Sequence, residues 1–200
     1  MEVPLKYFLP AYLIAYFLAA FVWRSYLTWK RTGINPVVFK GSDDAHDFIG
    51  RIFKLVFAFV VAAVLAYSFW PKLYAYFSPI EWLEQPWLKW LGFGLLLLSL
   101  VWTVLAQAHM GQSWRIGIDR EHPTTLVQNG VFGVSRNPIF LGMMITLLGL
   151  FLVIPNAVTL VTFVTGAVLI QIQVRLEEEF LRQTHGQDYS AYCRGVRRWF

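Results

Sequence analysis

The chain has 200 residues, of which 57% are hydrophobic and only 14% are charged. Soluble domains carry about 25% charged residues, so this composition excludes an ordinary soluble protein and indicates one integral membrane domain. The single cysteine, Cys193, excludes an internal disulfide and a cysteine-rich metal site. The formal net charge of +5 follows the loops around the apolar stretches, and therefore does not call for a nucleic-acid partner.

Five apolar stretches follow one another along the chain, at residues 5–23, 52–70, 90–108, 139–154 and 157–174. A spanning helix needs about 20 residues, so the fourth stretch is short and should tilt, break or thin the bilayer locally. Pro155 and Asn156 leave room only for a tight turn between the last two stretches, which should form an antiparallel hairpin. We expect an all-α integral membrane protein with about five transmembrane helices.

Two parts of different character make up this single domain. Residues 1–108 are three spans with few polar groups, and residues 109–200 hold a long connection, the hairpin and a tail. The connection at residues 109–137 contains many apolar residues, which favours an ordered loop at the membrane surface. The last helix should continue beyond the membrane to Gly186, a plausible helix end, and a short helix should follow at 187–196. Gly142 and Gly149 lie seven residues apart and predict close helix packing.

Basic residues predict the orientation of the chain. Of the 17 lysines and arginines, 14 fall on one side of the expected spans, and only Lys6, Lys72 and Lys89 fall on the other. Cytoplasmic loops are the ones enriched in Lys and Arg. We therefore expect the N-terminus outside and the C-terminus in the cytoplasm.

Polar residues at the open end of the hairpin are the best candidates for a site. At its entrance, Pro138 suits a first helical turn and Asn137 suits the N-cap position. A helix N-terminus also attracts anions, and Arg136 would strengthen that attraction and could bind a carboxylate bidentately.

The exit of the hairpin carries the opposite charge. Glu177 and Glu178 lie one turn beyond the apolar stretch, where they could bind a cation. The alternative is an ordinary solvated helix, with Arg175 and Glu178 paired at i,i+3 and Glu178 reaching Arg182 at i+4. If both ends of the hairpin converge, they offer the charges that bind a zwitterionic amino-acid group. No residues have the sequence spacing of metal ligands, so we expect no metal site.

Linked sequence boxes in the last part of the chain resemble those of a known superfamily. Residues 126–142 read LVQNGVFGVSRNPIFLG and residues 175–181 read RLEEEFL, followed by GQDYSAY at 186–192 and VRRW at 196–199. This pattern resembles the isoprenylcysteine carboxyl methyltransferase and phospholipid methyltransferase superfamily. Asn137 stands where that pattern has His, and Phe132 and Phe140 stand where it has Tyr, so we assign no base at position 137.

The resemblance implies a membrane-embedded methyltransferase that uses S-adenosylmethionine. Its acceptor would be lipophilic or lipid-attached, with an isoprenylcysteine-like carboxylate or a phospholipid-like amine, reached from the membrane lipid. It implies catalytic roles for Arg175, which could orient an acceptor carboxylate, and for Glu178. The residues that it places at the cofactor are Phe132, Arg136, Asn137, Pro138, Glu177, Glu178 and Tyr189.

Two other functions remain open from the sequence. One is a membrane reductase with a nicotinamide cofactor, which would bind the reduced dinucleotide and not S-adenosylmethionine. The other is a non-enzymatic scaffold or transport subunit, in which Arg136 and Glu178 would be dispensable. No carboxylate lies in the middle of a span, which disfavours proton-coupled transport.

Overall fold

The computed structural model describes residues 2–38, 45–117, 119, 122 and 124–200, and this part of the chain forms helices and no β-strand. The all-α prediction is therefore confirmed. The helical elements are α1 (Glu2–Phe17), the π-helix η1 (Leu18–Trp23), α2 (Arg24–Thr32), α3 (Ala45–Phe69), α4 (Pro71–Ala75), η2 (Glu81–Leu83), α5 (Pro86–Met110), η3 (Gly111–Ser113), η4 (Gly130–Gly133), α6 (Pro138–Val153) and α7 (Ala157–Gly195).

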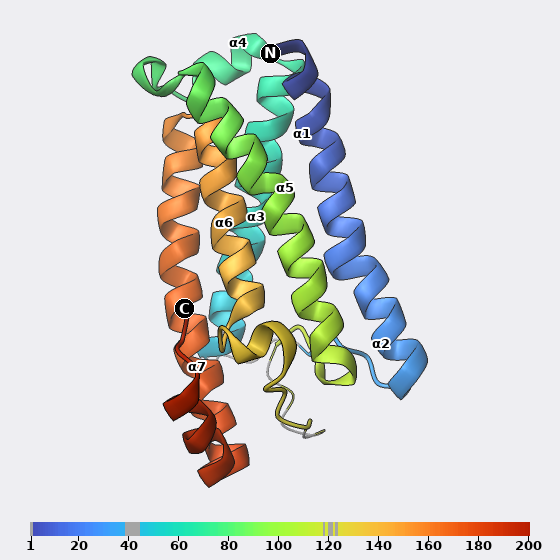
Figure 1. Cartoon of the computed structure of the whole chain (residues 1–200). Coiled ribbons are helices and arrows are strands. Elements are labelled where there is room, and N and C mark those ends of the chain that lie inside the picture. The colour runs from blue at the N-terminus through green and yellow to red at the C-terminus, as the bar shows by residue number, and fades with distance from the viewer. Residues whose placement is uncertain (1, 39–44, 118, 120–121, 123) are drawn as a thin grey trace.

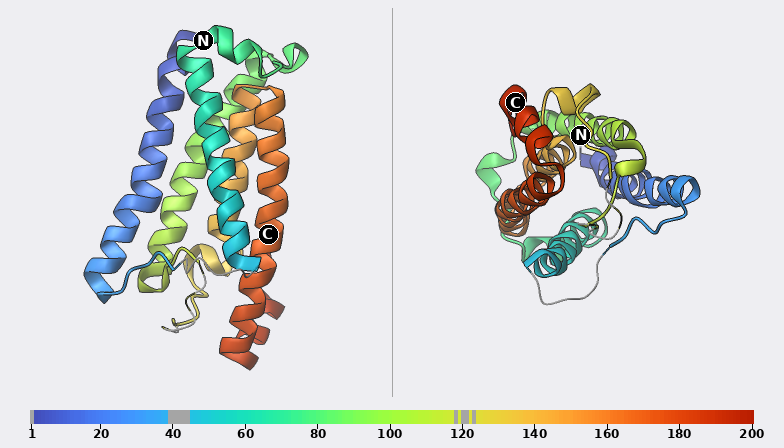
Figure 2. Two further views of the ribbon diagram at one scale, coloured as in Figure 1. Left: turned by 180° about the vertical axis from the view of Figure 1, so that it is seen from behind. Right: turned by 90° about the horizontal axis from the view of Figure 1, so that it is seen from below.

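The long helices form one bundle (Figures 1 and 2). Within the described residues, four segments are long and apolar enough to cross a membrane: α1 through α2, α3, α5 with η3, and α7. Helix α6 has only 16 residues, as the sequence predicts. Helices α3 and α6 run in the opposite direction to α1, α5 and α7, so the beginning of α6 lies beside the end of α5 (Figure 1). We call this end of the bundle, from which the tail of α7 projects, the site end.

The turn between α6 and α7 is as tight as predicted. Asn156 is the N-cap of α7, and its side chain accepts a hydrogen bond from the backbone N–H of Thr159 at 2.9 Å. The Thr159 hydroxyl accepts in return from the backbone N–H of Asn156 at 3.2 Å. This reciprocal capping box satisfies donors at a buried helix start and fixes the antiparallel hairpin.

A polar ladder joins the N-terminal helix to α5. Its four contacts each link residues 87 positions apart, and a constant separation means that the two helices run parallel. The rungs are Tyr12–Ser99, Tyr16–Thr103, Ala20–Gln107 and Arg24–Gly111, in which the Gln107 and Arg24 side chains donate to backbone carbonyls. Hydrogen bonds of this kind hold helices together in lipid, where apolar contact alone gives little specificity.

Close backbone approach joins α5 to α6. A Cβ atom on Gly92 would lie 2.7 Å from the carbonyl oxygen of Gly149, and one on Gly149 would lie 3.0 Å from that of Gly92. A Cβ atom on Gly142 would clash with the Thr103 hydroxyl. The predicted close packing at Gly142 and Gly149 is therefore confirmed, and α5 is the helix against which both residues pack.

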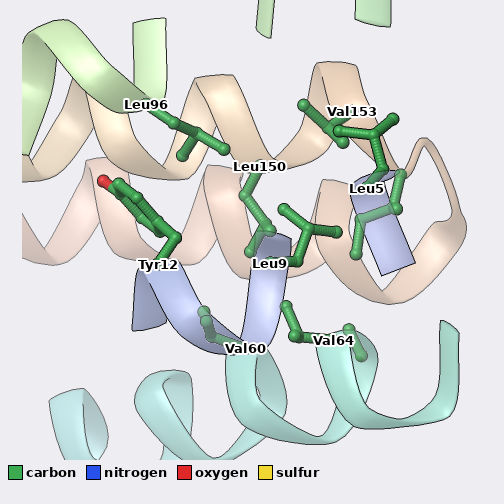
Figure 3. Packing of buried hydrophobic residues seen from close by; sticks show 10 residues of the cluster. Leu5, Leu9, Tyr12, Val60, Val64, Leu96, Leu150 and Val153 are labelled. Carbon is green, nitrogen blue, oxygen red and sulfur yellow. The ribbon is translucent and has the colours of Figure 1, made fainter. Parts of the chain in front are cut away.

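The larger of two apolar clusters in the described residues fills the half of the bundle away from the site end, and the smaller one, with Ile49, Val56 and Leu169, joins α3 to α7. Leu9 and Tyr12 from α1 meet Val64 from α3 and Leu96 from α5, with α6 residues completing the cluster (Figure 3). The site end instead carries polar side chains and two loops that are pinned together. There the backbone N–H of Val38 donates to Ile116 at 3.0 Å, and that of Ile116 donates to Pro36 at 2.8 Å.

Candidate functional site

Glu178 lies at the centre of the most connected polar group at the site end. It is in α7 and is only 4% exposed. Arg136 donates to it from the loop before α6, at 3.1 Å from Nη2, and the side-chain amide of Asn137 donates at 3.0 Å. Arg198 binds it as a fork, with Nε 3.1 Å from Oε1 and Nη2 2.7 Å from Oε2. We call these four residues the Glu178 cluster.

The tail of the chain reaches this cluster because α7 bends at Gly186. Gly186 has φ 53° and ψ −117°, a conformation that residues with a Cβ rarely adopt, and the helix resumes beyond it up to Gly195. The predicted end at Gly186 is thus a kink, after which the tail folds back (Figure 1). The segment after the tail helix then lies against the start of α6, where the N–H of Arg136 donates to Arg197 at 3.0 Å.

Further hydrogen bonds fix the folded-back segment in place. Nη1 of Arg136 donates to the carbonyl of Val196 at 2.8 Å, and the hydroxyl of Ser135 donates to that of Arg198 at 3.2 Å. The hydroxyl of Tyr192 donates to the carbonyl of Phe132 at 2.6 Å. The loop before α6 and the tail after α7 therefore form one polar layer across the site end.

The Glu178 cluster has an excess of positive charge. Two guanidinium groups share one carboxylate, which leaves a formal charge of +1 on these side chains. The hydrogen bonds to Glu178 raise the pKa of Arg198, so this group stays charged at any physiological pH. A partly buried cluster with surplus positive charge attracts an anion such as a carboxylate or a phosphate.

Two further features of the site end could receive a ligand. The hydroxyl of Tyr189 is buried, with the residue only 1% exposed, and has no nitrogen or oxygen hydrogen-bond partner among the described residues; the Cys193 thiol lies beside it. A cavity of about 640 Å³ opens between the loop at residues 124–128 and the tail helix, where His185 and Asp188 line it. A buried hydroxyl without a partner is costly, so a polar group that binds there gains a prepared donor.

Residues 87–188 match the phospholipid methyltransferase family, which is just over half of the chain. The chain belongs to the phospholipid methyltransferase family. The superfamily resemblance of the sequence boxes is thereby confirmed. A comparison with curated proteins finds no match.

The family match covers most of the candidate site but not all of it. It begins in α5 and includes Arg136, Asn137 and Glu178, and it ends at residue 188. Helices α1 to α3 lie outside the match, as do Tyr189 and Arg198. Family membership indicates methyl transfer on a lipid-like substrate, for which S-adenosylmethionine is the methyl donor that the family implies.

The structure brings together some of the predicted site residues. Pro138 begins α6 in its first turn, as expected. Asn137 occupies the N-cap position, but its side chain does not cap the helix and binds Glu178 instead. Phe132 is buried beneath the tail, with its carbonyl held by Tyr192. The roles of these residues towards a cofactor stay predictions.

Other predicted residues lie apart from the cluster. Arg175 is exposed and donates to the carbonyl of Gln171 at 2.6 Å, so the pair with Glu178 that the solvated-helix alternative expects does not form. Arg182 binds Glu179 rather than Glu178, at 3.3 Å. Neither pair of this alternative forms, because Glu178 faces inward to the chain segments that fold over α7, while these arginines face outward. Glu177 is half-buried, and Gln173, one turn before it, contacts His46 of α3.

Arg198 is the residue of the cluster that was not among the predicted site residues. The sequence holds a signal for it, because the box at 196–199 belongs to the superfamily pattern. Its contact depends on the bend at Gly186 and on the fold-back of the tail, which residue spacing does not reveal.

Proposed function

We propose that the chain transfers a methyl group from S-adenosylmethionine to the amine of a phospholipid-like acceptor, at the cytoplasmic face of the membrane. One observation carries the proposal: Arg136, Asn137 and Arg198 converge on the buried Glu178 at the open end of the hairpin. An isoprenylcysteine-like carboxylate is the other acceptor that the sequence boxes suggest, and the family match favours the phospholipid.

The residues at the site end fit this cofactor. S-adenosylmethionine offers a carboxylate, an ammonium group and a methyl group on a cationic sulfur, which makes that methyl group transferable. The surplus positive charge of Arg136 and Arg198 suits the carboxylate, and Glu178 and the free hydroxyl of Tyr189 suit the ammonium group. The open hollow of about 640 Å³ between the loop at residues 124–128 and the tail helix offers space at the same end of the bundle.

The protein contributes position and exclusion of water in this proposal. Displacement at a methyl group needs the two reacting atoms to be aligned, which side chains fixed by several hydrogen bonds achieve best. Each member of the Glu178 cluster is fixed in this way, and the folded-back tail covers it from the aqueous side. A covered site also strengthens the electrostatic interactions within it.

The distribution of charge supports a cytoplasmic site. Most lysines and arginines lie at the site end, and Lys72 and Lys89 lie at the other end. By the positive-inside rule, the tail of α7 then extends into the cytoplasm.

Calorimetric titration with S-adenosylhomocysteine tests the proposal on the purified full chain in detergent. We expect the wild-type protein to bind and Glu178→Gln to lose at least tenfold in affinity, because two arginines lose their shared charged partner. Glu179→Gln is the matched control, since Glu179 is an exposed neighbour that binds Arg182. Thermal unfolding shows whether each variant is folded, and Arg198→Gln provides a second test on the surface-exposed side of the cluster.

Two outcomes would contradict the proposal. Equal binding by wild type, Glu178→Gln and Arg198→Gln would move the cofactor elsewhere. Binding of a reduced nicotinamide dinucleotide in place of S-adenosylhomocysteine would favour a reductase.

A further inference from the structure

A buried arginine begins α2 at the site end. Arg24 is only 7% exposed; its Nη2 donates to the carbonyl of Gly111, and its Nε has no hydrogen-bond partner within the described structure. In the described part of the chain no carboxylate pairs with it, and Arg31, another cation, acts on it electrostatically.

The surroundings of Arg24 offset its charge only in part. Gly111 follows the last turn of α5, and the dipole of a helix places about half a negative charge at that end. A guanidinium group that is largely removed from water without a full counter-ion is costly. An anion is therefore the partner that this side chain lacks.

The next turn of α2 carries a second polar group without a partner. Thr28 is 1% exposed, and its hydroxyl makes no hydrogen bond with any described residue. It follows Arg24 by four residues and precedes Arg31 by three, so the three side chains share one helix face. Donors on consecutive turns, in a positively charged setting, suit the several oxygens of a phosphate group.

Aromatic side chains on the opposite face of α2 indicate its depth in the membrane. Trp23, Tyr26 and Trp29 are all exposed, and their rings follow one another at centroid distances of 5.9 and 6.4 Å. Exposed Trp and Tyr rings gather at the level of the lipid headgroups. Helix α2 also carries three basic residues and no acidic one. Basic sites at this level of the cytoplasmic face bind anionic headgroups.

We propose that Arg24 and Thr28, with Arg31 beside them, bind the phosphate group of an anionic phospholipid. The π-helix η1 directly precedes Arg24, and such turns are rare and often lie at functional sites. Helix α2 and the tail of α7 lie on opposite sides of the bundle (Figures 1 and 2), so this lipid is not the methyl acceptor. The site lies outside the residues that match the family and does not depend on the proposed methyl transfer.

Native mass spectrometry of the delipidated full chain tests the site by comparing bound lipids. Wild type should bind dioleoyl-phosphatidylglycerol about tenfold more tightly than dioleoyl-phosphatidylcholine, which has the same chains and no net charge. Arg24→Gln should abolish this preference. Lys30→Gln is the matched control, because it removes the same charge from the aromatic face of α2, where Lys30 lies 6.0 Å from the centre of the Tyr26 ring. Lys30→Gln should keep the preference.

A second pair of variants tests the site without changing a charge. Thr28→Val preserves the shape of the side chain and should weaken phosphatidylglycerol binding several-fold. Its melting temperature should equal that of wild type or exceed it, because no described group loses a hydrogen bond. Thr32→Val is the control, since the Thr32 hydroxyl donates to the backbone carbonyl of Thr28 at 2.8 Å. This variant should bind the lipid as wild type does.

Three outcomes would overturn the inference. They are an unchanged lipid preference in Arg24→Gln, wild-type affinity in Thr28→Val, and displacement of the lipid by inorganic phosphate, which would assign the site to a soluble anion. If Arg24→Gln does not fold, Thr28→Val decides. Every folded variant should bind S-adenosylhomocysteine as wild type does, so failure of the proposed methyl transfer leaves this lipid site standing.

Discussion

At the scale of single residues, hydrogen bonds distinguish side chains that are paired within the fold from side chains that leave a polar atom for a ligand. Arg198 meets both oxygens of Glu178 with a planar fork, a geometry that lysine does not reproduce. Tyr189 and Tyr192 lie one turn apart in the tail and are both buried. Only Tyr192 uses its hydroxyl within the described structure, on the carbonyl of Phe132.

The two tyrosines should therefore respond in opposite ways to loss of the hydroxyl. Tyr192→Phe should lower the free energy of unfolding by about 0.5–1.5 kcal/mol, because the Phe132 carbonyl loses its donor. Tyr189→Phe should leave stability unchanged or slightly raised, and should weaken S-adenosylhomocysteine binding. Chemical denaturation in detergent measures the first effect and calorimetry the second. A stability loss confined to Tyr189→Phe would contradict this assignment.

At the scale of helices, glycine positions decide how closely α5 and α6 pack. Gly92 and Gly149 present their backbones to each other, whereas a Cβ atom on Gly94 would meet nothing within 4 Å. Two glycines that are two residues apart in α5 thus lie in contrasting surroundings, one at the helix interface and one in open space.

Alanine substitution should separate these two glycines clearly. Gly92→Ala should destabilise the bundle by about 1–3 kcal/mol, because the new methyl group meets the carbonyl of Gly149 and forces the helices apart. Gly94→Ala should be neutral or stabilising by about 0.5–1 kcal/mol, since alanine restricts the unfolded chain. Thermal unfolding of both variants in one detergent checks the difference, and equal effects would contradict close packing at Gly92.

The sequence predicts the helices better than it predicts their contacts. Apolar length and the turn at Pro155 and Asn156 indicate the hairpin, and Gly186 indicates where α7 bends, because these signals are local. The convergence of Arg136 and Glu178 also follows from their places at the two open ends of the hairpin. The contribution of Arg198 depends on a folded-back tail, and residue spacing does not predict such a fold-back.

At the scale of the whole molecule, the chain separates its polar chemistry from its apolar core. The core cluster of Figure 3 lies in one half of the bundle, and the Glu178 cluster lies at the site end. The single cysteine, Cys193, lies in the tail helix beyond the bend at Gly186 and is partly exposed. It therefore reports which side of the membrane the site faces.

Labelling of Cys193 should determine the orientation without any added cysteine. We expect a membrane-impermeant maleimide to label it in inside-out vesicles and not in sealed cells, because the tail is proposed to be cytoplasmic. Trp82 is 75% exposed at the opposite end. Trp82→Cys in a Cys193→Ser background should give the reverse pattern. Labelling of Cys193 from outside sealed cells would invert the proposed orientation.

The ladder between the N-terminal helix and α5 has a consequence for biosynthesis. Tyr12 and Tyr16 enter the membrane early, but their partners Ser99 and Thr103 are made 87 residues later. Until then the two phenolic hydroxyls lack these hydrogen-bond partners, and hydrocarbon solvates them poorly. Insertion of α5 should therefore be the event that commits the first helix to its final place, and a chain arrested before α5 should remain extractable or prone to degradation.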